Sequence, residues 1–335
     1  MDITTHALAS LALARTVLHR APRLSWLVVV AAGVVADADV CSVFFGPSAY
    51  LLWHRTYTHS ILASILWAAF FGLCYRALAP QNQNNKFGYL TVGVTALFAQ
   101  WLHLAMDTCQ WEGVQLLWPF RTTRMADDWL ASVDLWIIVI LAVALVLPEL
   151  LHLVSGEIGA VDKGPRGRTA AIAGLTLLCA YVGVRAILHS SAVALLQSRA
   201  YSGEPTRRVA AFPESASLTT WHGIVETEST LHVLTVKVGS GGVSDSQTAL
   251  KFFKPEPTPI LETAQNTQIA KDFLRIARFP KATVVKIGAG YEVELLDLRY
   301  KALGETRHEI VATIDLDATG KVASQNLIWA EDQKR

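Results

Sequence analysis

The sequence predicts an all-α polytopic membrane helix bundle of about six helices, followed by a soluble α+β domain with an antiparallel sheet. Of the 335 residues, 52% are hydrophobic and only 17% are charged, whereas soluble globular proteins carry about 25% charged residues. The shortage is confined to the first part, since 12 of the 29 Lys and Arg and 11 of the 28 Asp and Glu precede Arg199. We therefore predict a membrane domain over residues 1–198 and a soluble extension over residues 199–335.

The membrane helices are predicted from uninterrupted apolar runs. About 20 apolar residues are needed to span a bilayer, and four runs reach roughly that length: residues 61–78, 87–106, 135–154 and 169–196. Two shorter runs, residues 3–18 and 24–36, bring the count to about six. The alternative is that these are buried core helices of a large soluble protein, which the number and length of the four long runs disfavour.

Basic residues in the connections predict the orientation. If six helices alternate, eight Lys and Arg fall on one side of the membrane and three on the other. The first set is Arg15, Arg20, Arg23, Arg76, Lys86, Lys163, Arg166 and Arg168, and the second is Arg55, Arg121 and Arg124. Because cytoplasmic loops carry the excess of positive charge, we expect the loop at residues 37–59 and the soluble extension to lie on the extracytoplasmic side.

The extension has the composition of an ordinary soluble domain. Segments such as "LHVLTVKV", "ATVVKIG" and "HEIVATIDLD" contain β-branched residues and alternate between apolar and polar, with Gly or Pro between them, which is typical of strands. Residues 223–229, 249–254, 291–300 and 321–329 are also predicted as strands. Residues 260–277 have the apolar spacing of a helix that ends before Pro280.

Histidine and aspartate side chains occur at the ends of the predicted helices. Counted along each helix from its basic end, they lie at one common level, about 20–30 Å from that end at 1.5 Å per residue. Ionisable groups at such depth usually face a bundle interior, where they are paired or bind a ligand. The eight candidates are His6, Asp37, Asp39, His54, His59, His103, Asp107 and Asp134.

These residue types indicate a metal site. Imidazole and carboxylate without thiolate are typical ligands of zinc, manganese or iron in hydrolytic and redox centres, and the four cysteines have no CxxC spacing. His103 and Asp107 are four residues apart, so they share a helical face. We expect one or two divalent ions per chain, and eight candidates fit a dinuclear site better than a single ion. Each pair alone also has a plainer explanation, such as an intrahelical hydrogen bond, a solvated helix end or a helix cap.

The motifs resemble a known family. "MDITTHALASLALAR", "GVVADADV", "HRTYTHS", "WLHLAMDT" and "VDLW" are similar to the YdjM/YbcI-like family of predicted membrane-bound metal-dependent hydrolases. The family pattern of T-H, D-x-D, H-R-x-x-T-H-S, H-x-x-x-D and a later Asp is matched at the eight candidates above. The resemblance implies a multi-pass protein of the bacterial inner membrane, and "WHGIVET", "RIARFP" and "DLRY" resemble the soluble extension of longer members.

The hypothesis is therefore a membrane-bound hydrolase that uses metal-activated water, with Asp39 or His54 as general base or acid. Arg55 is expected to hold an anionic group of the substrate, because a guanidinium binds phosphate or carboxylate through two bonds. Arg185 and His189 are expected to add a second anion contact. The membrane position favours membrane lipid and a lipid-linked or small-molecule phosphoester, whereas the net charge of +1 disfavours nucleic acid.

Two other classes of function stay open at this point. Intramembrane His and Asp also mark the paths of ion or proton transporters, although the inner halves of these helices contain few polar residues besides Glu149 and His152. Alternatively, the metal would only stabilise the bundle of a structural or regulatory protein. For Arg55, a lipid headgroup contact or an ion pair with a ligand carboxylate are the competing explanations.

Overall fold

The computed structural model describes residues 1–79, 88–157, 167–201, 203–239, 242–243, 249–304 and 309–330. Lys86, Lys163 and Arg166, which contribute to the predicted orientation, lie outside these residues. The chain forms two compact units: Met1–Val40 with Arg55–Ile187, and Cys41–His54 with Leu188–Arg335. Contacts thus place residues 41–54 with the second unit, whereas the boundary after residue 198 follows composition and stays a prediction.

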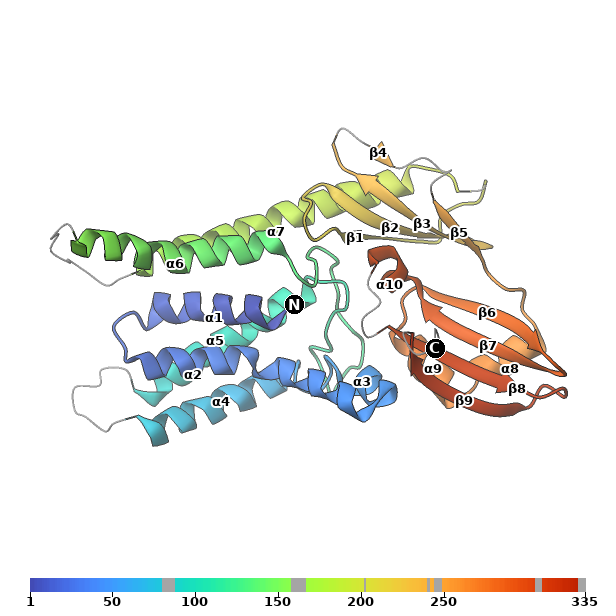
Figure 1. Ribbon diagram of the computed structural model, residues 1–335, viewed down its shortest axis with the longest axis horizontal. Coiled ribbons are helices and arrows are strands. Elements are labelled where there is room, and N and C mark those ends of the chain that lie inside the picture. Colours follow the sequence, from blue (N-terminus) through green and yellow to red (C-terminus); the bar gives the residue numbers. More distant parts are fainter. Residues whose placement is uncertain are drawn as a thin grey trace. The chain divides into compact units, whose positions relative to one another are not determined.

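The first unit is a helical bundle (Figure 1). Its helices are α1 (Ile3–Val17), α2 (Arg23–Val34), α4 (Ile61–Leu78), α5 (Tyr89–Thr108), α6 (Leu135–Glu157) and the first part of α7 (Arg168–Gln197). α1, α2, α4 and α5 pack on one another, and α6 packs on α1. Ile137 and Leu141 of α6 share a buried apolar cluster with Ala171 and Leu178 of α7, so both long helices line the same core.

Five segments of the described chain are long and apolar enough to cross a membrane. They are Arg23–Phe45, Ile61–Leu78, Tyr89–Thr108, Leu135–Leu153 and Arg168–Gln197. Their surfaces are also apolar: Leu66, Leu90 and Ile187 are 64%, 67% and 68% exposed, as expected of side chains that face lipid. α1 has 15 residues, about 22 Å at 1.5 Å per residue, and is too short to count as a sixth span.

Local sequence explains where the helices near the site begin and end. Asp2 caps α1 by accepting a hydrogen bond from the backbone N–H of Thr5 at 3.0 Å, and Ser60 caps α4 through Ala63 at 3.1 Å. α2 does not end in a loop but continues as a 3₁₀ helix, η1 (Val35–Phe45). The aspartates of "VVADADV" therefore lie on η1.

The second unit contains two antiparallel sheets and short helices. The first sheet has β1 (Arg208–Pro213), β2 (Thr220–Glu226), β3 (Thr230–Lys237), and both β4 (Gly242–Val243) and β5 (Leu250–Phe253) paired with β3. The second is the meander β6 (Pro280–Ile287), β7 (Gly290–Asp297), β8 (Ile310–Leu316) and β9 (Val322–Trp329). α3 (Pro47–Trp53) contacts β9. The predicted fold class, a helical membrane part followed by an antiparallel α+β part, is confirmed.

Three details of the extension differ from the prediction. The expected helix at residues 260–277 is two helices, α8 (Pro259–Gln265) and α9 (Gln268–Ile276), because Thr267 caps a new helix through the N–H of Ala270. The expected strand at residues 291–300 ends at Asp297, which caps α10 (Leu298–Leu303) through the N–H of Arg299. β1 was not predicted, although Arg208–Pro213 pairs in register with β2.

Candidate metal centre

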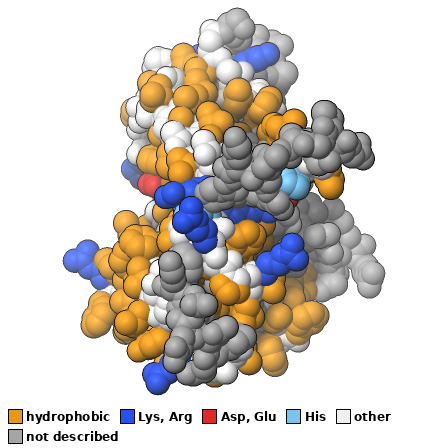
Figure 2. Space-filling model, turned by 90° about the vertical axis from the view of Figure 1, so that its left-hand side faces the viewer, with side chains coloured by type: hydrophobic (Ala, Val, Ile, Leu, Met, Phe, Trp, Pro, Cys, Tyr) orange, Lys and Arg blue, Asp and Glu red, His pale blue; other side chains and the backbone are white. Residues whose placement is uncertain are grey.

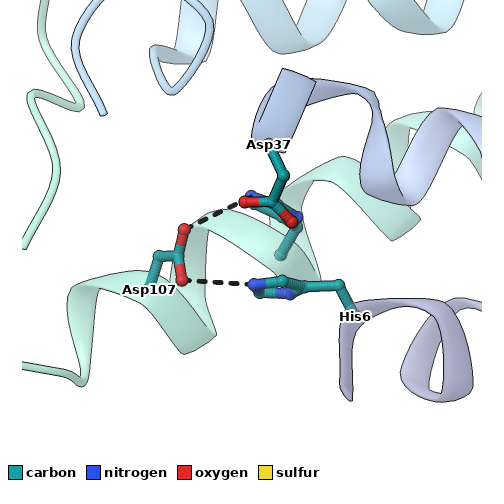
Figure 3. A group of neighbouring side chains, drawn as sticks. His6, Asp37 and Asp107 are labelled. Atoms are coloured by element: carbon teal, nitrogen blue, oxygen red, sulfur yellow. Dashed lines mark hydrogen bonds and ion pairs between the residues drawn. The ribbon is translucent and has the colours of Figure 1, made fainter. Parts of the chain in front are cut away.

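Four ionisable side chains converge inside the helical unit. His6 of α1, Asp37 of η1, and His103 and Asp107 of α5 each offer one ligand atom, and these atoms all lie within 4.8 Å of one another. His6, His103 and Asp107 are at most 1% exposed and Asp37 is 5% exposed. Figure 3 shows the side chains of His6, Asp37 and Asp107 pointing toward one another from three different segments. The group therefore has the composition and spacing of a metal site.

Helix geometry places these side chains. His103 and Asp107 are one turn apart, and Asp107 Oδ2 lies 3.3 Å from His103 Nε2. The other ring nitrogen of His103 donates to the carbonyl oxygen of Gly33 at 2.8 Å, which fixes the tautomer and directs Nε2 toward the group. A Cβ atom at Gly33 would collide with the side chain of Ser10, so glycine permits the close approach of α1 and α2.

His59 adds a fifth side chain to the cluster. We call the five residues the metal group: His6, Asp37, His59, His103 and Asp107. His59 Nε2 lies 3.2 Å from Asp107 Oδ2 and 3.5 Å from Asp37 Oδ1. On its far side, Nδ1 lies 2.9 Å from Asp39 Oδ2, an oxygen that also accepts from Thr58 Oγ1 at 2.6 Å. The structure thus makes Asp39 the partner that orients His59, whereas the sequence had suggested it as a ligand.

The charge state of His59 depends on these carboxylates. Burial lowers the pKa of His59, but the attraction of the three surrounding carboxylates outweighs it and raises the pKa to about 10. The ring is therefore charged near neutral pH when only protein groups surround it. A metal ligand must be deprotonated, so an ion that binds here would displace a proton, and its affinity would rise with pH.

Unsatisfied polar atoms test whether an ion fits. Within the described part of the chain, His59 Nε2, His103 Nε2, Asp37 Oδ2 and Asp107 Oδ2 are buried and have no hydrogen-bond partner. Buried polar atoms are normally hydrogen-bonded. Ligands of a four-coordinate zinc ion, each 2.0–2.1 Å from the metal, lie about 3.3 Å apart. Several separations here are 3.2 to 3.7 Å, and the ligand atoms of His6, Asp37, His103 and Asp107 all lie within 4.8 Å of one another. The residues fit a single divalent cation.

Comparison with protein families identifies relatives of both parts of the chain. The model of the YdjM inner membrane protein family matches residues 1–192, more than half of the 335 residues. The chain belongs to the YdjM inner membrane protein family. The YfhP C-terminal alpha/beta plait domain matches residues 259–335, which contain α8, α9 and the sheet β6–β9. No curated protein and no solved structure matches the chain. The protein is thus a YdjM-family membrane protein with a candidate site for a divalent metal.

Besides Asp39, two predicted ligands lie outside the metal group. His54 ends α3, where its ring stacks on Tyr50 with centroids 4.5 Å apart, and it belongs to the second unit. Asp134 accepts hydrogen bonds from the N–H of Trp136 at 3.1 Å and from the Tyr181 hydroxyl at 2.9 Å. Its carboxylate therefore caps α6 and holds α7, which is the plainer explanation considered above. With these two outside the group, one ion suits the site better than two.

The predicted anion-binding residues also have protein partners. Arg55 Nε donates to Glu112 Oε2 at 2.8 Å, and its Nη1 lies 3.6 Å from Asp107 Oδ1. Arg185 is fully buried and donates to the carbonyl oxygen of Trp129 at 3.1 Å. His189 lies against Trp221, with ring centroids 5.5 Å apart, in the second unit. Of the three, only Arg55 contacts the metal group.

Sequence reasoning missed three residues near the group. The amino group of Met1 forms an ion pair with Asp107 Oδ1. Gln110 Nε2 donates to Asp107 Oδ1 at 2.7 Å, and Glu112 binds Arg55. Both follow α5 within the "DTCQWE" stretch, only three and five residues after Asp107. That proximity was a usable signal, but the residues lie in a loop, where no periodicity predicts the direction of a side chain.

Proposed function

We propose that this protein is a membrane-bound metal-dependent hydrolase. The observation that carries the proposal is the convergence of buried imidazole and carboxylate groups, several of whose inner atoms have no hydrogen-bond partner among the described residues. His6, Asp37, His103 and Asp107 would hold the ion, and His59 would complete the group. Three imidazoles and two carboxylates without thiolate suit zinc or manganese.

A divalent ion in such a site lowers the pKa of a bound water toward neutrality and stabilises negative charge that develops at a phosphoryl or carbonyl centre. The protein would supply the group that accepts the proton released by this water. Asp39 Oδ2 lies 2.9 Å from His59 Nδ1, so this carboxylate would be the proton acceptor beside the metal group. Asp39 also accepts from the backbone N–H of Arg55 at 2.8 Å, which keeps the carboxylate in place.

Arg55 supports an anionic substrate, a phosphoester or a lipid-linked molecule. Its guanidinium lies between a ligand carboxylate and Glu112, whose side chain is 20% exposed. A substrate phosphate would replace Glu112 and bind the guanidinium through two bonds. If so, Arg55→Lys should lower turnover by about 10- to 100-fold, as expected for one charge-assisted bidentate contact, and leave metal content unchanged. Normal turnover would exclude the clamp, and loss of metal would show that Arg55 orients Asp107.

The proposed location is a multi-pass arrangement in the bacterial inner membrane, with the metal group and the second unit on the extracytoplasmic side. Its support is the eight-to-three division of basic residues between the two sets of connections. A fluorescent reporter that matures only in the cytoplasm, fused after Arg335, should stay dark. A bright fusion would mean that the orientation is the reverse of the one proposed. It would not affect the proposal of a metal site.

The decisive experiment combines metal analysis with an activity panel on the purified protein. We expect about one zinc or manganese per chain, loss of the metal in His103→Ala, and hydrolysis of some phosphoester or ester that chelator abolishes. Asp134→Asn is the matched control, because that carboxylate lies outside the group and should leave the metal bound. Full activity in metal-free protein would refute the proposal. Bound metal without turnover on broad panels would favour a structural or regulatory role.

A further inference from the structure

Basic side chains gather at the end of the helical unit opposite the metal group. His19 and Arg20 follow α1, Arg23 begins α2 and Arg168 begins α7. Arg168 Nε donates to the carbonyl oxygen of Thr16 at 3.2 Å, which brings the start of α7 to the end of α1. Figure 2 views the molecule from this end and shows Lys and Arg side chains across the face. We call His19, Arg20, Arg23 and Arg168 the basic cluster.

The basic cluster differs from the nearby Arg15 in how its charge is balanced. Arg15 is neutralised: its Nη2 lies 3.2 Å from Glu149 Oε1, and its Nη1 donates to the carbonyl of Leu145 at 2.9 Å. In contrast, burial and the guanidinium groups of Arg168 and Arg20 lower the pKa of His19. Like charges therefore lie close together there, and both arginines are exposed. A bound anion would relieve their repulsion.

Apolar side chains lie one helical turn deeper on two of the helices. Leu27 follows Arg23 by four residues and is 66% exposed, and Ile172 follows Arg168 by four residues and is 43% exposed. Residues four apart share a helical face, and both helices are candidate membrane spans. In a phospholipid, the phosphate lies at the membrane surface and the acyl chain lies deeper. An arginine with an exposed aliphatic side chain one turn deeper can contact both parts. A soluble anion would use only the upper half of this surface.

We propose that the basic cluster, with Leu27 and Ile172 beneath it, binds an anionic phospholipid of the surrounding leaflet. The argument is charge complementarity together with an exposed apolar side chain one turn below each of two arginines, since clusters of basic residues at the ends of membrane helices attract anionic headgroups. The site is separate from the metal group and does not depend on the proposed hydrolase activity.

Native mass spectrometry of the full chain in neutral detergent tests this, with phosphatidylglycerol and phosphatidylcholine as probes. We expect phosphatidylglycerol to bind at least about 10-fold more tightly, and Arg20→Gln with Arg168→Gln to weaken it by about 10- to 30-fold. Arg76→Gln is the matched control. Arg76 ends α4 at the same end of the bundle (Figure 1), but its guanidinium covers Tyr89 at 5.1 Å, so binding should change less than about 2-fold.

Three results would overturn the proposal: equal binding of phosphatidylcholine, equal weakening by Arg76→Gln, or full displacement of the lipid by millimolar inorganic phosphate, which would mean a small-anion site. If the double variant does not fold, wild-type protein still decides the matter. Headgroup binding through exposed arginines should weaken several-fold between about 0.05 and 0.5 M NaCl, and affinity that is independent of salt would contradict it. The single variant Arg20→Gln, at an exposed position, should show an intermediate loss.

Discussion

Both units bury charged groups, but the hydrogen bonding of two such groups differs. In the second unit, Asp297 is 2% exposed and accepts from the N–H of Arg278 at 3.0 Å and from Arg299 Nε at 2.8 Å. Arg299 in turn donates to the carbonyl of Ile276 at 3.2 Å. In the helical unit, the inner atoms of Asp37, His59 and their neighbours have no hydrogen-bond partner among the described residues. Similar burial thus accompanies two different states of hydrogen bonding.

The difference separates a structural ion pair from a ligand site. A buried pair stabilises a fold only when nearly all its donors and acceptors are satisfied, and the Asp297–Arg299 pair meets that condition while it joins α9, β7 and α10. The metal group does not meet this condition, so without an ion it would lower the stability of the fold. Buried polar atoms without partners lose their solvation energy and gain no hydrogen bond in return. A cation would satisfy several of these atoms at once. The comparison therefore supports metal binding better than the types of residue alone.

The largest expected effect is on metal affinity. Asp37→Asn keeps the shape of the side chain but removes the charge that a cation needs, so the affinity for zinc should fall by more than about 100-fold, beyond the loss typical of residues that only support ligands. Titration with a competing chelator measures it. Asp297→Asn is the control in the second unit and should leave the affinity unchanged. Equal affinity for zinc in the two variants would show that Asp37 is not a metal ligand.

The same two variants should differ in the opposite sense in folding stability. Asp297→Asn leaves Arg299 buried without its counter-ion and should lower the free energy of unfolding of that unit by about 3 kcal/mol. Asp37→Asn, measured in chelator, should change stability by less than about 1 kcal/mol, because it removes a charge that the metal-free protein does not fully satisfy. Pulse proteolysis of the full chain reports both values. A large loss in Asp37→Asn would mean that the cluster is structural.

A smaller effect is expected at Asp39, which has features of both regions. Its carboxylate accepts hydrogen bonds from Arg55, Thr58 and His59, as in a structural cluster, yet it orients a metal-group histidine. Asp39→Asn should therefore weaken metal binding by only about 10- to 100-fold. A loss as large as that of Asp37→Asn would show that Asp39 is itself a ligand, as the sequence first suggested.

Much of the fold was predictable because its signals are local. The run at residues 61–78 coincides with α4 (Ile61–Leu78), since twenty or so apolar residues have few alternatives to a spanning helix. Strand alternation located β3 and β8 within one or two residues. The split at Thr267 and the helix after Asp297 were missed because each depends on a side-chain cap, which competes weakly with periodicity in a sequence pattern.

The sequence predicted the type of site, a buried cluster of His and Asp, but not which of the candidate residues belong to it. The spacing of His103 and Asp107 placed both on one face of a helix, and the structure brings His6, Asp37 and His59 to them. Asp39 differs from Asp37 because the two residues are two positions apart along η1, which turns their carboxylates to opposite sides of His59. No pattern in the sequence distinguishes these two directions.

By itself, the sequence determined the membrane helices, the antiparallel extension and the residue types available for chemistry. Apolar runs and alternation act through neighbours in the chain, so their consequences can be worked out without a structure. The tertiary structure decided which polar atoms meet: Asp134 caps α6 and binds Tyr181, while Asp37, His59 and Asp107 face one another. That choice depends on how helices distant in sequence approach, which is set by packing contacts such as that of Gly33 with Ser10.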